Sequence, residues 1–309
     1  MATYVRLDGR MAKHLITALF ILAPLSYSAT TIVGFGSAGT SATAIAPGQI
    51  VRVTVDGIQA TPARIMYASG YPWPATLGDI SVRLISITPP SSTTNFDLPI
   101  LSLEPVPRCP IGFPGALSCP PLVTITVQIP YSVPTSGTGQ IIVSENGVAG
   151  DPVPVSFAAD QVQMIAVIRS NGSLITPGNP ADPGENVALF AYGLGGVSPA
   201  AVAGQSPPNP PALVTGSFRL SYDIRYDAPP YADPSNSLPQ IQPDFVGLVP
   251  GLAGLYQINF MAPSVPADNA GCPIAGGIIF TIIYHSNVTI DLRSDHSFHG
   301  VGICVKPPR

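Results

Sequence analysis

Val123-Thr124-Ile125-Thr126-Val127-Gln128-Ile129 alternates apolar with polar residues, which predicts a β-strand with one buried and one exposed face. Residues 51–56 (VRVTVD) show the same alternation. Residues 141–148 contain Asn146-Gly147, the dipeptide most typical of a tight hairpin turn. The chain is therefore expected to be all-β, with antiparallel strands. Further strands are predicted over residues 80–87, 162–168, 186–192, 217–226, 254–261, 278–284 and 288–292.

The composition agrees with many short strands joined by turns. The 309 residues include 37 Pro and 30 Gly, which are unfavourable inside helices and common in turns. Hydrophobic residues make up 46% of the chain, enough for a packed core rather than a disordered protein. Only 10% of residues are charged and 13 are basic, which argues against nucleic-acid binding.

Two short motifs recur in the same order about 130 residues apart. Pro47-Gly48-Gln49 is echoed by Pro183-Gly184-Glu185, and Ser132-Val133-Pro134 by Ser264-Val265-Pro266. Such self-similarity indicates a duplicated unit. We therefore predict two tandem immunoglobulin-like β-sandwich domains, residues 29–160 and 161–309.

The N-terminal residues 1–28 are typical of a cleaved signal peptide. Arg6, Arg10 and Lys13 supply positive charge, and residues 15–25 form an apolar run too short to span a bilayer. No second long apolar run follows. The mature protein is thus expected to be secreted or on the cell surface, without a membrane span.

Four cysteines remain after the signal: Cys109, Cys119, Cys272 and Cys304. An even number in an exported chain predicts disulfides. Three connectivities are possible, and proximity in the sequence favours Cys109–Cys119 with Cys272–Cys304. A four-thiolate zinc site is the alternative, but no Cys-x-x-Cys spacing supports it.

Three segments of the second half resemble a known family. They are NPADPGE (residues 179–185), YGLGGVSP (192–199) and GLVPGLAGLYQIN (247–259). They are similar to the Solibacter-type uncharacterised C-terminal domain family of secreted acidobacterial proteins, over roughly residues 44–304. The resemblance implies an exported all-β module and implies no activity. Residues 119–123, 222–245 and the tail depart from the family pattern.

All histidines after the signal lie near the C-terminus. His285, His296 and His299, with Asp291 and Asp295 among them, could surround zinc or another transition metal. The alternative is a solvated hairpin loop at the edge of the second sandwich, tied by a disulfide.

Two segments carry aromatic residues that a sandwich core does not require. Tyr67, Tyr71 and Trp73 lie in the first, and Tyr226 and Tyr231 in the second. Flat aromatic side chains suit sugar stacking or a protein interface. The alternative is that they pack over the ends of the sandwiches.

We predict that the protein is not an enzyme and needs no cofactor, because no nucleophile elbow or paired-carboxylate pattern is evident. Residues 34–39 match G-x-G-x-x-G, but no helix is expected after them, so a flexible segment is predicted there. The expected function is a binding, adhesive or structural role at the cell surface. Its partner would be a surface protein, a carbohydrate or a second copy. The alternatives are a self-assembling subunit of a fibre or layer, and a metal-dependent enzyme using the His285–His299 region.

Overall fold

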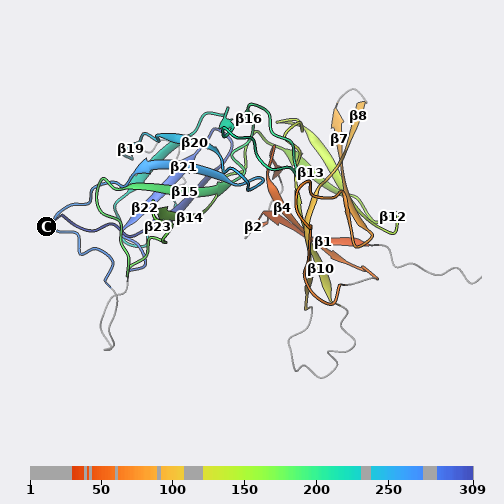
Figure 1. Cartoon of the computed structure of the whole chain (residues 1–309), viewed down its shortest axis with the longest axis horizontal. Helices are drawn as coiled ribbons and strands as arrows, with labels where there is room; N and C mark the ends of the chain where they lie inside the picture. Colours follow the sequence, from red (N-terminus) through yellow and green to blue (C-terminus); the bar gives the residue numbers. More distant parts are fainter. Residues whose placement is uncertain are drawn as a thin grey trace, which may run out of the picture.

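The computed structural model describes residues 30–37, 40–41, 44–59, 62–88, 92–107, 121–230, 238–273 and 284–308. Over these ranges the regular structure consists of strands, arranged as two β-sandwiches side by side (Figure 1). The described part contains no helix long and apolar enough to cross a membrane. The predicted all-β class is confirmed. The signal peptide, residues 1–28, lies outside the described residues.

The first sandwich pairs two mainly antiparallel sheets. One sheet has the order β2-β1-β4-β10-β9-β5, with bounds Thr40–Ser41, Thr31–Ser37, Ile50–Asp56, Leu122–Gln128, Ile100–Val106 and Met66–Tyr67. The other has the order β3-β13-β11-β7-β6, with bounds Ala44–Ile45, Val153–Phe157, Thr138–Glu145, Ile80–Thr88 and Thr76–Leu77. Two further strands pair with this second sheet, β12 (Val148–Ala149) with β11 and β8 (Ser92–Asp97) with β7.

The second sandwich is built in the same way. One sheet has the order β14-β15-β21-β20-β17-β16, with bounds Gln163–Arg169, Asn186–Tyr192, Tyr256–Met261, Phe245–Leu248, Leu213–Val214 and Val197–Ser198. The other has the order β19-β18-β22-β23, with bounds Gln240–Ile241, Arg219–Asp223, Val288–Arg293 and Phe298–Ile303.

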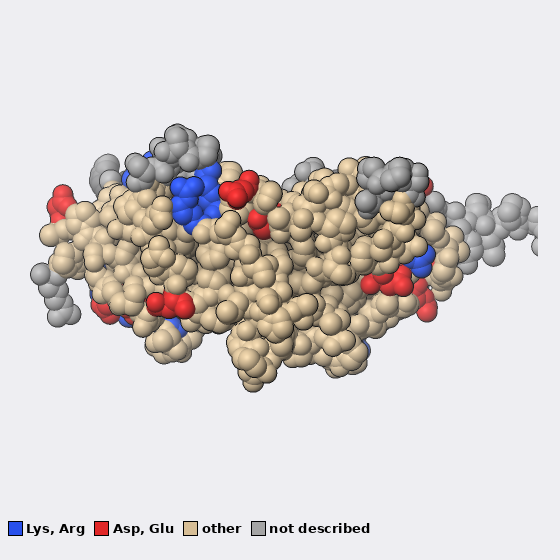
Figure 2. Space-filling model, turned by 90° about the horizontal axis from the view of Figure 1, so that it is seen from above, with Lys and Arg blue, Asp and Glu red and all other residues tan. Residues whose placement is uncertain are grey.

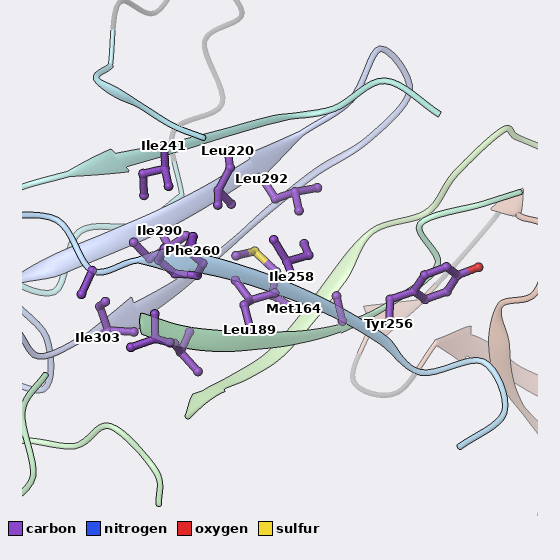
Figure 3. Close-up of a cluster of buried hydrophobic side chains, with 14 of the residues drawn as sticks. Met164, Leu189, Leu220, Ile241, Tyr256, Ile258, Phe260, Ile290, Leu292 and Ile303 are labelled. Carbon is purple, nitrogen blue, oxygen red and sulfur yellow. The ribbon is translucent and has the colours of Figure 1, made fainter. Parts of the chain in front are cut away.

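Each sandwich encloses its own hydrophobic core. The alternation predicted from the sequence is realised in β4 and β15, whose buried residues point between the sheets. One core extends from Ile45 to Phe157 and the other from Val162 to Val305. In Figure 3, Leu189 and Ile258 of one sheet face Leu220, Ile290 and Leu292 of the other.

The two repeated motifs adopt the same hydrogen-bond pattern. In the first unit, Gly48 N donates to Ile129 O at 3.1 Å, and Ile129 N donates to Gln49 O at 2.8 Å. In the second, Gly184 N donates to Ala262 O at 2.9 Å, and Ala262 N to Glu185 O at 2.8 Å. Both glycines have positive φ, 72° and 76°. The motifs therefore play the same structural part, and the strand orders β1-β4-β10-β9 and β14-β15-β21-β20 correspond.

Each unit contains one parallel β-pairing between an early and a late segment of its chain. Ile45 pairs with Phe157 in parallel in the first, and Ala181 forms a parallel bridge with Val305 in the second. The C-terminal segment therefore occupies the place that β13 holds in the first sandwich. Residues 278–283 of the strand predicted at 278–284 lie outside the described residues, and β22 pairs with β18 as β11 pairs with β7.

The expectation of a flexible segment at residues 34–39 is wrong over Gly34–Ser37, and residues 38–39 lie outside the described part of the chain. Gly34–Ser37 belong to β1, which pairs with β4 along its length. Gly34 and Gly36 weaken the strand signal, since glycine has low strand propensity. The neighbouring strand compensates for this weakness, and a Cβ on Gly34 would lie 3.3 Å from Thr54 Cβ.

Candidate functional site

The Tyr71–Trp73 segment, for which the sequence left open ligand binding or packing over the end of a sandwich, lies where the two sandwiches meet. Tyr71 Oη donates to Gly251 O and accepts from Ala253 N, each at 3.0 Å. Its ring stacks on Trp73, with 5.7 Å between ring centroids. The Trp73 backbone N donates to Gly204 O at 2.7 Å. Both residues therefore take part in the contact between the sandwiches.

A buried amide reinforces this junction. Gln128, on β10 of the first sandwich, is fully buried, and its Oε1 accepts from Gly204 N of the second sandwich at 2.7 Å. Its Nε2 donates to Gly48 O at 3.2 Å. Tyr131 packs against the core of the second sandwich, and burial raises the pKa of its phenol to about 12. The two sandwiches are thus joined by hydrogen bonds and by apolar packing.

The other predicted aromatic residues lie apart. Tyr67 is on the short strand β5 and is 65% exposed. Tyr226 stacks on Tyr284 with 3.8 Å between ring centroids, and its hydroxyl accepts from Ala270 N at 2.8 Å. Tyr231 lies outside the described residues. The structure therefore does not gather the five predicted aromatic residues into one described site.

The histidines and aspartates proposed as metal ligands are also dispersed. His285 is exposed and lies 3.7 Å from Asp227, while His299 Nδ1 accepts from Met164 N at 3.2 Å. Burial lowers the pKa of His299. Asp295 and His296 lie exposed in the turn between β22 and β23. Within the described ranges, no three His, Cys, Asp or Glu side chains could hold a metal ion together.

The turn between β22 and β23 is held by the linker that joins the sandwiches. The hydroxyls of Ser294 and Ser297 both donate to Asp160 Oδ1. Ser297 Oγ also accepts from Val162 N at 3.0 Å. The turn thus anchors the start of the second sandwich, which gives it a structural role.

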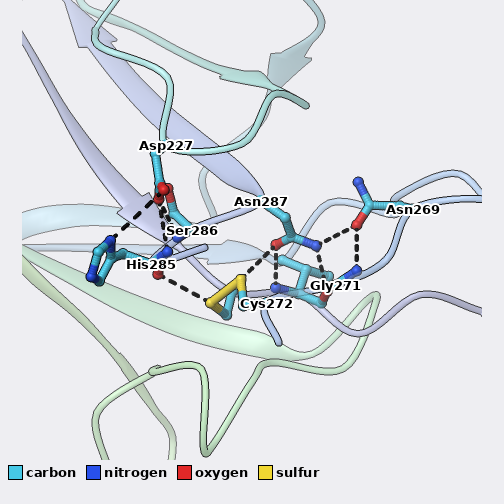
Figure 4. The surroundings of a disulfide bond; sticks show 9 residues. Asp227, Asn269, Gly271, Cys272, His285, Ser286 and Asn287 are labelled. Atoms are coloured by element: carbon cyan, nitrogen blue, oxygen red, sulfur yellow. Dashed lines mark hydrogen bonds and ion pairs between the residues drawn. A yellow bond between two sulfur atoms is a disulfide. The ribbon is translucent and has the colours of Figure 1, made fainter. Parts of the chain in front are cut away.

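Cys272 and Cys304 form a disulfide, the pairing favoured by their proximity (Figure 4). Beside it, the Asn287 side chain donates to Asn269 Oδ1 at 2.8 Å and accepts from Val305 N at 2.9 Å. The disulfide therefore belongs to a hydrogen-bonded network that ties the C-terminal segment to the sandwich. Cys109 and Cys119 lie outside the described residues.

The NPADPGE segment surrounds one arginine. Arg169, at the end of β14, donates to both carboxylate oxygens of Glu185 at 2.7 Å. It also donates to Asn179 Oδ1 at 2.8 Å, to Pro180 O at 3.4 Å and to Asp182 Oδ2 at 3.1 Å. These five bonds match the five N–H donors of a guanidinium group. Arg169 therefore has its hydrogen-bonding capacity used within the protein.

Beside this arginine, the outer face of the second sandwich has a hollow of about 470 Å³. Its size falls in the range of about 300–1,000 Å³ that is typical of small-molecule sites. It was not foreseen from the sequence. The residues around it are mostly uncharged. They come from β14 and the turn after it, from β15 and β21, and from the position before β20, and include Arg169, Asn186, Phe190, Asp244, Gln257 and Asn259.

The register of the strands explains the hollow. Ala188 lies between Ile168 of β14 and Asn259 of β21, and its small side chain leaves space between larger neighbours. In the next row, Phe190 lies opposite Gln257. Because side chains alternate along a strand, these residues face outward while Val187 and Leu189 are buried.

The hollow is lined by polar groups without a partner in the described part of the chain. Gln257 Nε2 donates to Asn259 Oδ1 at 2.7 Å, while Gln257 Oε1 and Asn259 Nδ2 have no hydrogen-bond partner among the described residues. The Asp244 backbone N donates to Asn259 O at 2.8 Å, while its exposed carboxylate has no hydrogen-bond partner in the described part of the chain. Asn186, Gln257 and Asn259 are amide residues at outward positions of otherwise apolar strands. This pattern was the sequence signal that could have indicated the hollow.

Comparisons with known proteins assign no family. No protein-family model matches the chain, and no curated protein matches it. A solved structure of the Yersinia pseudotuberculosis adhesin InvE is similar over 90% of this chain, with 11% sequence identity and a TM-score of 0.21. The present chain covers 58% of that adhesin chain, less than two thirds of its length. The resemblance to the Solibacter-type family remains a prediction.

Proposed function

We propose that the protein is an exported, non-catalytic binding protein that makes adhesive contacts at the cell surface through the outer face of its second sandwich. The observation that carries this proposal is the hollow between β14, β15 and β21. It combines free space with polar groups that have no hydrogen-bond partner among the described residues. Gln257 and Asn259 lie on strand β21, and Asp244 directly precedes strand β20.

Three further features support an exported protein with a contact function. The junction through Gln128 and Tyr71 holds the sandwiches together, so that a load applied to one passes to the other. Charged side chains are sparse on the face shown in Figure 2. The Cys272–Cys304 disulfide fits an oxidising compartment outside the cytosol.

Adhesion of protein-coated beads tests this proposal. Beads carrying the purified protein are incubated with bacterial cells and with their extracted extracellular polymer, then washed under flow. We expect retention on at least one surface, and weaker retention with Ala188→Tyr, which fills the hollow. Equal retention of both proteins, or of neither above albumin-coated beads, would contradict the proposal. Sedimentation velocity separates this function from self-assembly, since a polymer would favour the fibre or layer alternative.

A further inference from the structure

We infer that the hollow on the second sandwich binds a neutral saccharide. This inference rests on the proposed function and adds the chemical class of the ligand. The site is formed by the Gln257–Asn259 amide pair, the Phe190 ring and the Asp244 carboxylate.

The charge of the hollow excludes an anionic ligand. Arg169 is the cation among its lining residues, and its N–H groups are occupied by Glu185, Asp182, Asn179 and Pro180. Asp244 contributes a negative charge without a partner in the described residues. A carboxylate or sulfate ligand would be repelled by Asp244 and would find no free guanidinium donor.

The hydrogen-bonding groups instead suit hydroxyls. Gln257 Oε1 and the Asp244 carboxylate accept hydrogen bonds, while Asn259 Nδ2 donates. A sugar hydroxyl both donates and accepts, so neighbouring hydroxyls can satisfy such a mixed set. Because Gln257 donates to Asn259 at 2.7 Å, the pair is oriented before a ligand arrives, which reduces the entropy lost on binding.

The apolar part of the hollow complements the carbon face of a sugar ring. Phe190 of β15 pairs with Gln257 of β21, so the phenyl ring and the amide are neighbours on the same face of the sheet. The small Ala188 forms the floor in the next row, between Ile168 and Asn259. A ring with apolar C–H groups on one side and hydroxyls at its edge fits these two kinds of surface together.

The inference is tested with the purified full chain on an array of neutral oligosaccharides of glucose, mannose, xylose and N-acetylglucosamine, with polygalacturonate and heparin as acidic probes. Titration calorimetry then measures affinity for the best ligand. We expect binding to a neutral glycan, reduced about tenfold or more in the Gln257→Ala/Asn259→Ala variant. The matched control is Asn95→Ala, on the exposed strand β8 of the first sandwich, which should leave affinity unchanged.

Three results would overturn the inference: no binding to any neutral glycan, binding to acidic probes alone, or equal affinity of the double variant with an unchanged thermal midpoint. If the double variant unfolds, the affinity of Asp244→Asn for the same glycan is measured instead. This variant should remain folded, because Asp244 is exposed and outside the core. Beads that adhere in a hollow-dependent manner without glycan binding would leave the proposed function intact and remove this inference alone.

Discussion

The side-chain oxygen of Gln128 in the first sandwich accepts a hydrogen bond from the backbone N of Gly204 in the second, with 2.7 Å between the two atoms. The Gln128 side chain is fully buried. One amide thus satisfies Gly204 N across the junction and Gly48 O within its own sandwich. A buried polar contact of this kind fixes orientation as well as adding stability.

Replacing Gln128 by Leu should destabilise the protein by about 2 kcal/mol, because Gly204 N and Gly48 O lose their partner while buried. Urea unfolding measures the loss. Gln140→Leu on β11 is the control, since the Gln140 side chain has no partner among the described residues.

The junction should also couple the unfolding of the two sandwiches. In calorimetry, the double variant Gln128→Leu/Tyr71→Phe should therefore show two unfolding transitions. A single undivided transition would argue against a role of these two side chains in coupling the sandwiches.

The duplication provides a matched pair of glycine substitutions. Gly48 and Gly184 share a positive φ, so alanine strains both positions by about 1–2 kcal/mol. A Cβ on Gly48 would also lie 2.2 Å from Tyr131 Cε1, whereas a Cβ on Gly184 meets only Met261 Cε, at 3.9 Å. We expect Gly48→Ala to cost about 1–3 kcal/mol more than Gly184→Ala in urea unfolding. Equal losses would show that Tyr131 moves away without cost.

The strands were predictable where their residues alternate, as in β4, β10 and β15. The Asn146-Gly147 turn was also readable, and both residues have positive φ. Strand β1 was missed because its pairing comes from β4 rather than from its own glycine-containing sequence. Local pattern indicates the faces of a strand, but its neighbours depend on the whole fold.

The candidate site could not be predicted for the same reason. The hollow requires Ala188 to lie between Ile168 and Asn259, and nothing in the local sequence reveals that register. Tyr71 and Trp73 were recognised as unusual aromatic residues, but their contacts with Gly251 and Gly204 join parts of the chain far apart in sequence.

Acid should weaken the second sandwich through Glu185. The hydrogen bonds from Arg169 lower the pKa of Glu185, so the pair stabilises the fold above the ordinary glutamate pKa. That stability is lost as the pH falls below about 4.3 and through the folded-state pKa. The thermal midpoint of Glu185→Gln should therefore start lower near neutral pH and fall less steeply in acid. Asp97→Asn, in an exposed ion pair, should retain the steep fall.

Removing the disulfide should destabilise the protein by about 3–4 kcal/mol, because Cys272 and Cys304 close a long loop of the unfolded chain. Chemical unfolding of Cys272→Ser/Cys304→Ser against the unmodified protein measures this loss. Adding a reducing agent to the double variant then tests the remaining pair: a further loss would show that Cys109 and Cys119 are also bridged. A double variant as stable as the parent would contradict the structural role of the bond.

The enclosure of Arg169 by Glu185, Asp182 and Asn179 also bears on the conditions under which a ligand would stay attached. Dissolved ions weaken attractions between exposed charges and have little effect on contacts between neutral groups. Because Arg169 is already paired within the protein, and a neutral ligand carries no charge for Asp244 to attract, the strength of its contacts in the hollow would be nearly the same in dilute and in brackish water. Attachment through this face would therefore persist through changes of salinity that release proteins held by charge.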